Sequence, residues 1–71
     1  MAKQKQVLHM VDNGKEYRVI KYYGRTNPYR LYQYMNVYGD DGFLHEKRVL
    51  LAEYCCMNSI FWYMVQNNIG Y

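Results

Sequence analysis

The sequence predicts an α+β fold: a four-stranded antiparallel β-meander with one C-terminal α-helix packed on one face of the sheet. Three observations support this prediction. Asn13-Gly14 separates two runs of alternating apolar residues, and residues 39–42 (Gly-Asp-Asp-Gly) separate two more. In the C-terminal tail the apolar residues instead recur at helical spacing. Alternating runs around a tight turn are typical of β-hairpins, whereas a period near 3.6 indicates a helix.

The first hairpin is predicted over residues 7–23. Asn-Gly is a strong hairpin signal because both central positions of a type I′ turn need a positive φ. Pairing Asp12 with Lys15 sets the register. It gives two opposed pairs on an apolar face and two on the reverse face: Met10–Tyr17 and Leu8–Val19, then His9–Arg18 and Val7–Ile20.

The second hairpin is predicted over residues 29–51. The short break at residues 24–28, which contains Gly24 and Pro28, favours an antiparallel return beside the second strand. If the loop pairs Tyr38 with Phe43, side-chain alternation divides this hairpin into two faces. The core face is expected to hold Leu31, Met35, Val37, Leu44 and Leu50. The outer face is expected to hold Tyr32, Tyr34, Asn36, Tyr38, His45 and Lys47.

The helix is predicted over about residues 58–67. Asn58 or Ser59 offers an N-cap, and Asn67, Asn68 and Gly70 offer a C-terminal stop. The apolar residues that recur at helical spacing are Met57, Phe61, Met64 and Val65. Neighbouring aromatic residues make the segment apolar on more than one side, as expected for a helix that covers a sheet.

Size and composition indicate one small, marginally stable domain over residues 1–71. The chain is 51% hydrophobic and 18% aromatic, which is too apolar for intrinsic disorder. Ten tyrosines suit half-wet surfaces, because each ring is apolar while its hydroxyl needs a partner. With no secretory signal, no span of about 18 apolar residues and two adjacent cysteines, a cytoplasmic protein with reduced thiols is expected, without membrane association.

The sequence predicts no enzyme, cofactor or metal site. His9, His45, Cys55 and Cys56 carry zinc-binding atoms, but their spacing matches no standard zinc motif. A nucleophilic cysteine would need an oriented base beside it, and the spacing supports none. The acids of the two turns are explained by turn chemistry.

The outer, tyrosine-rich sheet face is the candidate binding surface. Its predicted binding residues are Tyr32, Tyr34, Tyr38, Arg30, Lys47, His45 and Arg18, with Tyr22 on the same face. Tyr and Arg are the usual anchors of protein interfaces, so docking on a larger protein is the preferred interpretation. The net charge of +3 also allows a nucleic-acid partner, whose bases and phosphates the same residues would contact. Two alternatives remain: a homodimer that buries two such faces, or an ordinary wet sheet face.

Residues 28–32 (Pro-Tyr-Arg-Leu-Tyr) and 67–71 (Asn-Asn-Ile-Gly-Tyr) give the chain a resemblance to small uncharacterised accessory proteins of bacterial mobile elements and phages. The resemblance covers about half of the chain and transfers no functional residue. It implies a stand-alone inhibitor or regulator that blocks a host or competitor machine, as anti-CRISPR and other anti-defence proteins do. Small DNA-binding regulators are the other class that it implies.

Overall fold

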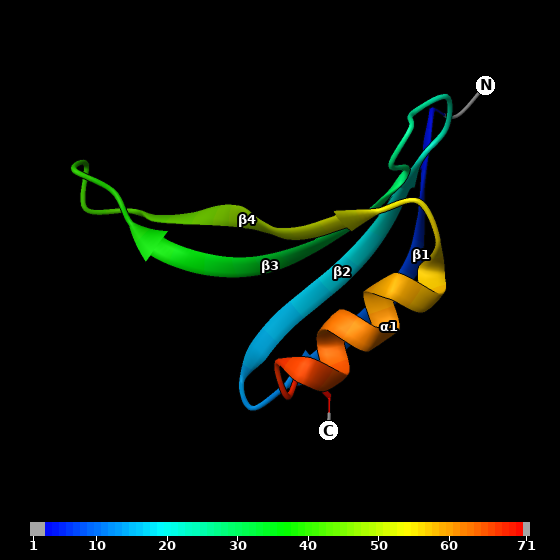
Figure 1. Cartoon of the computed structure of the whole chain (residues 1–71). Coiled ribbons are helices and arrows are strands. Elements are labelled where there is room, and N and C mark those ends of the chain that lie inside the picture. The colour runs from blue at the N-terminus through cyan, green and yellow to red at the C-terminus, as the bar shows by residue number, and fades with distance from the viewer. Residues whose placement is uncertain (1–2, 71) are drawn as a thin grey trace.

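The computed structural model describes residues 3–70 and contains four strands and one helix (Figure 1). These are β1 (Gln4–Asp12), β2 (Lys15–Tyr22), β3 (Tyr29–Tyr38), β4 (Leu44–Tyr54) and α1 (Met57–Gln66). The strands form one sheet in the order β1-β2-β3-β4, and every neighbouring pair is antiparallel. The predicted α+β meander with one C-terminal helix is confirmed. No helix within residues 3–70 is long and apolar enough to cross a membrane.

The first hairpin has the predicted turn and register. Asn13 and Gly14 have φ angles of 53° and 78°, as a type I′ turn requires. The first four predicted pairs are present: Asp12–Lys15, Met10–Tyr17, Leu8–Val19 and His9–Arg18. The fifth is wrong, because a bulge at Val7 places Gln6 opposite Ile20.

The second hairpin is displaced by one residue from the predicted register. Tyr38 pairs with Leu44 instead of Phe43. The cause is the loop, which is closed by a hydrogen bond from Gly39 N–H to the Phe43 carbonyl (2.9 Å) and turns through Gly42 at φ 79°. This is a three-residue loop with a left-handed glycine at its end, whereas the prediction assumed four loop residues. One residue of slip moves the β4 side chains from Leu44 to Leu50 to the other face.

The slip corrects the predicted faces of β4. Leu44 and Leu50, expected in the core, lie opposite Tyr38 and Tyr32 and are 55% and 46% exposed. Near the end of β4, a bulge at Leu51 shifts the register by one more residue, so that Leu31 lies opposite Ala52. The β4 residues after the bulge therefore return to their predicted faces. Leu31 is fully buried as predicted, whereas Met35 and Val37 are not part of the core.

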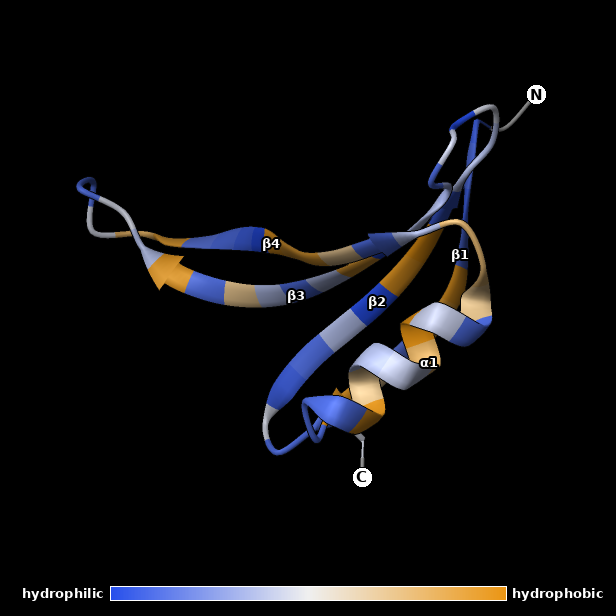
Figure 2. Cartoon of the chain, in the orientation of Figure 1, coloured by the Kyte–Doolittle hydropathy of each residue, from blue (hydrophilic) through white to orange (hydrophobic). Residues whose placement is uncertain are grey.

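The main core lies between α1 and one face of the sheet. Its buried residues are Tyr17, Val19, Leu31, Ile60, Met64 and Ile69. The helix turns Ile60 and Met64 inward, while Phe61 and Val65, which had been expected on the buried stripe, are exposed. Apolar residues around most of the helix leave its rotation undetermined by the sequence alone, which explains this error. Figure 2 shows that more and less hydrophobic segments alternate along α1.

The C-terminal stop of the helix is confirmed, whereas its predicted start is not. The helix begins at Met57, with Cys56 as the N-cap in place of Asn58 or Ser59. At the other end, Ile69 N–H donates to the Met64 carbonyl and Asn68 N–H to the Val65 carbonyl, which is a Schellman motif. Asn68 adopts the left-handed conformation with φ 56°. The motif buries Ile69 against Met64 in the core and thereby ties the helix end to the sheet.

A two-stranded ribbon extends beyond the part of the sheet that the helix covers. Strand β2 pairs with β3 only as far as Glu16 and Tyr34. Beyond that row, β3 and β4 continue with each other alone, and Figure 1 shows them curving away from β2 and α1. We call residues 35–47 the arm, and the remainder of the described chain the body. The arm gives the molecule extents of 39 × 34 × 15 Å.

Candidate binding surface

The sheet face opposite α1 brings together most of the predicted binding residues. Pairing of β2 with β3 places Arg18 opposite Tyr32 and Glu16 opposite Tyr34, and alternation puts them all on one face. Strand β4 adds Arg48, which lies opposite Tyr34. We call the resulting cluster the Tyr–Arg patch, and it consists of Arg18, Tyr22, Arg30, Tyr32, Tyr34 and Arg48.

Each arginine of the patch stacks on a tyrosine ring. The guanidinium carbon of Arg48 lies 4.4 Å from the ring centre of Tyr32. That of Arg18 lies 4.4 Å from the centre of Tyr34, and that of Arg30 lies 4.9 Å from the centre of Tyr22. Each such contact contributes about 0.5–1 kcal/mol at an exposed site and more where water is excluded. The three cations are therefore held in place before any partner arrives.

Burial distinguishes the two central tyrosines. Tyr32 lies on the predicted outer face but is only 5% exposed, so little of it is accessible to a partner. Because Tyr32 faces away from the helix, neighbouring side chains of the patch itself cover it, including Arg48. Tyr34 is half-buried and meets Tyr32 edge-to-face at 6.4 Å. Tyr32 thus supports the patch, and Tyr34 and the arginines form its accessible part.

A hydrogen-bonded chain of hydroxyls runs through the patch. The hydroxyls of Tyr22 and Tyr32 are 3.2 Å apart, and Arg48 Nη1 donates to the Tyr22 hydroxyl at 3.4 Å. Burial raises the pKa of Tyr32, and the bond with Tyr22 adds to this rise. Burial opposes the change at Tyr22, but the bonds with Tyr32 and Arg48 lower its pKa. Either hydroxyl could be the donor of the bond between Tyr22 and Tyr32.

Arg48 is the arginine of the patch whose positive charge has no carboxylate paired with it in the described chain. Arg18 Nη2 donates to Glu16 at 2.8 Å, and Arg30 Nε lies 3.3 Å from Glu53. The second contact is an ion pair without hydrogen-bond geometry, because Arg30 Nε has no hydrogen-bond partner. Within residues 3–70, no carboxylate lies within ion-pair distance of Arg48. Hydrogen bonds with the Tyr34 and Tyr22 hydroxyls raise the pKa of Arg48, so it stays charged.

Lys47 and His45 do not belong to this surface. They were predicted beside the tyrosines, but they lie opposite Met35 and Val37 on the other face of the arm. The one-residue slip of β4 is the reason, and the same slip brings Arg48, which the prediction missed, into the patch. The signal that could have identified Arg48 is Gly42, since a glycine in that position is typical of a three-residue hairpin loop. Tyr38 lies on the expected face, but far out on the arm and 79% exposed.

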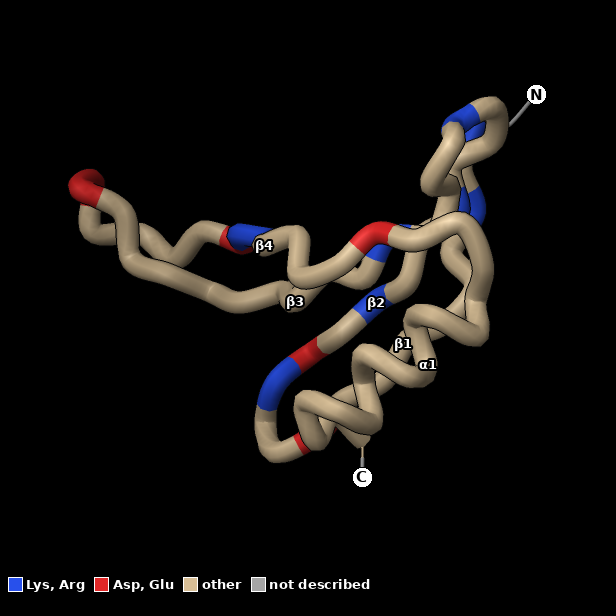
Figure 3. Tube along the Cα trace, viewed as in Figure 1, with Lys and Arg blue, Asp and Glu red and all other residues tan. Residues whose placement is uncertain are grey.

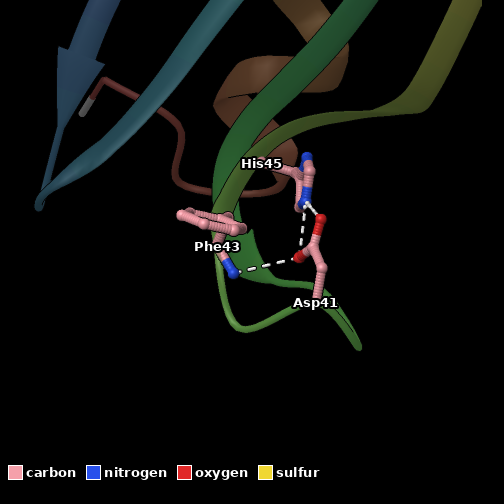
Figure 4. Close-up of polar contacts among 3 residues, drawn as sticks. All are labelled: Asp41, Phe43 and His45. Atoms are coloured by element: carbon pink, nitrogen blue, oxygen red, sulfur yellow. Dashed lines mark hydrogen bonds and ion pairs between the residues drawn. The ribbon is translucent and has the colours of Figure 1, made fainter.

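His45 instead stabilises the tip of the arm. Its Nε2 lies 3.0 Å from both carboxylate oxygens of Asp41, and Asp41 Oδ1 accepts a hydrogen bond from Phe43 N–H at 2.9 Å (Figure 4). The Phe43 amide first, and His45 second, lower the pKa of Asp41. The ring also lies so close to Gly39 that a β-carbon there would come within 2.8 Å of it. His45 is thus a turn residue.

Two exposed cysteines and a polar hollow lie outside the Tyr–Arg patch. Cys55 and Cys56 are free and exposed, and Cys56 Sγ lies 3.3 Å from Ser59 Oγ, a contact that lowers the pKa of Cys56. Residues 3–70 contain no group of three or more His, Cys, Asp or Glu side chains placed to hold a metal ion. A polar hollow of about 250 Å³ lies where β2 ends and the arm begins, with Glu16, Tyr34 and Glu46 in its lining.

Comparison of the chain with protein-family models, curated proteins and solved structures found no match.

Proposed function

We propose that this chain is a small, non-enzymatic cytoplasmic binding protein that docks on a larger protein through the Tyr–Arg patch. The observation that carries the proposal is the stacking of three arginines on three tyrosines, on a sheet face that the chain's own helix leaves open. Tyrosine and arginine dominate the energetics of protein interfaces because they combine apolar area with directional hydrogen bonds. Side chains that are already ordered lose less entropy when a partner binds.

The charges around the patch favour a protein over DNA. Arg18 and Arg30 are already paired with Glu16 and Glu53, which leaves Arg48 as the one patch cation without a carboxylate at ion-pair distance among residues 3–70. Figure 3 shows acidic residues at the tip of the arm, where Asp40 and Asp41 lie. These carboxylates would meet phosphates if the arm entered a DNA groove. A protein surface with carboxylates opposite Arg48 fits this distribution better. The resemblance to accessory proteins of mobile elements adds an inhibitory or regulatory role, of the anti-defence type, to the proposal.

The test is capture of a partner from host extract by immobilised wild type, Arg30→Ala and Lys47→Ala, each with and without nuclease. The two substitutions remove the same charge, one inside the patch and one on the other face of the sheet. We expect a protein to be retained by wild type and by Lys47→Ala but to be lost with Arg30→Ala, and to survive nuclease. Truncating an anchor residue of this kind lowers the affinity for the partner by about tenfold or more.

Two results would contradict the proposal. Equal capture by both variants would show that the patch does not contact the partner. Capture that disappears after nuclease treatment, with an affinity that falls steeply as salt rises, would instead support the sheet-face DNA-binding alternative.

A further inference from the structure

The molecule is less compact than a monomer of its length normally is. Its radius of gyration is 13.5 Å, whereas a compact domain of 71 residues has about 11 Å. Its accessible surface is 5309 Å², whereas a monomer of 8.7 kDa typically exposes about 4,700 Å². The excess of about 600 Å² per chain gives about 1,200 Å² for two chains, the lower limit of a specific interface.

The arm accounts for this excess, because nothing in the described chain covers either of its faces. Every β4 residue from Leu44 to Leu50 is exposed, as are residues 36–38 of β3. A two-stranded ribbon is marginally stable by itself in water. The uncovered side chains include three large apolar residues on a single face: Tyr38, Leu44 and Leu50. A group of exposed apolar side chains of this kind is a candidate for burial by a partner.

The two faces of the arm differ in whether they can pair with a copy of themselves. The face that continues the Tyr–Arg patch carries Glu46 beside Arg48, two positions apart on β4. The reverse face carries Lys47 and His45 and no carboxylate on the paired strands from 35 to 47. Two copies of the reverse face would oppose like charges, whereas two copies of the first face oppose unlike charges.

We propose that the arm, together with the adjoining β4 residues Arg48 and Leu50, is a homodimerisation element. A second copy of this chain packs face to face on Tyr38, Leu44, Glu46, Arg48 and Leu50. The two arms run antiparallel about a two-fold axis at the level of Lys47. That axis places Glu46 opposite Arg48 of the copy, and Leu44 opposite Leu50 of the copy, each contact occurring twice. The antiparallel direction also keeps the two acidic tips at opposite ends of the interface (Figure 3). The copy thereby supplies the carboxylate that Arg48 lacks within its own described chain. Because Arg48 and Leu50 lie opposite Tyr34 and Tyr32, a second copy and the larger protein of the proposed function would compete for this part of the patch.

The test is charge exchange read by sedimentation velocity over a range of protein concentrations. Wild type is expected to sediment as a dimer that dissociates on dilution. Glu46→Arg and Arg48→Glu each place like charges opposite one another twice, and each should weaken dimerisation by about a hundredfold or more. The double variant Glu46→Arg/Arg48→Glu exchanges the two charges and should restore the dimer. Lys47→Glu makes the same change in charge as Arg48→Glu on the reverse face and should leave dimerisation unaltered.

Leu44→Glu provides an independent variant, because Leu44 lies outside the patch and is exposed in the single chain. It should be folded by circular dichroism and monomeric at every concentration. The Leu44→Glu variant keeps all six patch residues. Whether it still captures a larger protein therefore tests the proposed function separately from dimerisation. A wild type that is monomeric throughout would overturn the inference. So would a dimer that is unaffected by Leu44→Glu and by the two single charge exchanges.

Discussion

The body and the arm are made of similar strands, but side chains are buried in the body and exposed in the arm. In the body, Leu31 of β3 is completely buried beneath α1. Six residues later on the same strand and the same face, Val37 is 38% exposed. The strand sequence alternates in both regions, but only the body has a helix to cover one face. Alternation therefore predicts which side chains share a face, and a second layer decides whether that face becomes a core.

The largest expected effect is a difference in the unfolding free energy lost when an apolar side chain is truncated in the body or in the arm. Ile60 is fully buried in the body, and Ile60→Ala should lower the free energy of unfolding by about 2–5 kcal/mol. That is a large part of the total for a domain this small. Leu44→Ala on the arm is the matched control, and it should cost under about 0.5 kcal/mol in the monomer.

Urea denaturation at a low protein concentration, where any dimer has dissociated, measures both values. Similar losses for Ile60→Ala and Leu44→Ala would contradict the division of the molecule into a packed body and an uncovered arm.

The first hairpin could be predicted in detail, because its signals are local. Asn13-Gly14 allows one tight turn, and that turn fixes the register of β1 and β2 as far as the bulge at Val7. The end of the helix was predictable for the same reason, since Asn68 tolerates the left-handed conformation that a helix stop requires. Where the backbone conformation is dictated within a few residues, the sequence is sufficient.

The second hairpin and the rotation of the helix could not be predicted, because both depend on choices that the local sequence leaves open. Gly-Asp-Asp-Gly is compatible with a four-residue loop or with a three-residue loop that ends at Gly42. The difference of one residue exchanges Lys47 for Arg48 in the candidate site. The helix offers apolar residues on several sides, and the side that packs on the sheet carries Ile60 rather than Phe61. The predicted set therefore differs from the patch at three positions: Arg48 takes the place of Lys47, His45 lies on the other face, and Tyr38 lies out on the arm.

A smaller effect concerns a hydroxyl in the body and its counterpart on the arm. Tyr32→Phe removes the hydrogen bond to Tyr22 and should lower the free energy of unfolding by about 0.5–1.5 kcal/mol. Tyr38→Phe removes a hydroxyl from a side chain that is 79% exposed and should leave stability unchanged. Thermal unfolding of the two variants, which differ from wild type by one oxygen each, makes the comparison. An unaltered melting temperature for Tyr32→Phe would show that the hydroxyl chain does not support the patch.

The smallest effect is confined to the tip of the arm and depends on pH. Hydrogen bonds from Phe43 N–H and His45 hold the pKa of Asp41 below its ordinary value in the folded protein. A lowered folded pKa stabilises the tip above the pKa of the unfolded chain, about 3.9, and this contribution disappears as the pH falls through the folded value. His45→Ala should raise the pKa of Asp41 only part of the way, because the Phe43 amide remains. NMR titration of the Asp41 carboxyl measures the shift, with His9→Ala as the control. Because Asp41 lies in the arm, its titration should leave the melting of the body unaltered, and coupled changes in the two regions would contradict their independence.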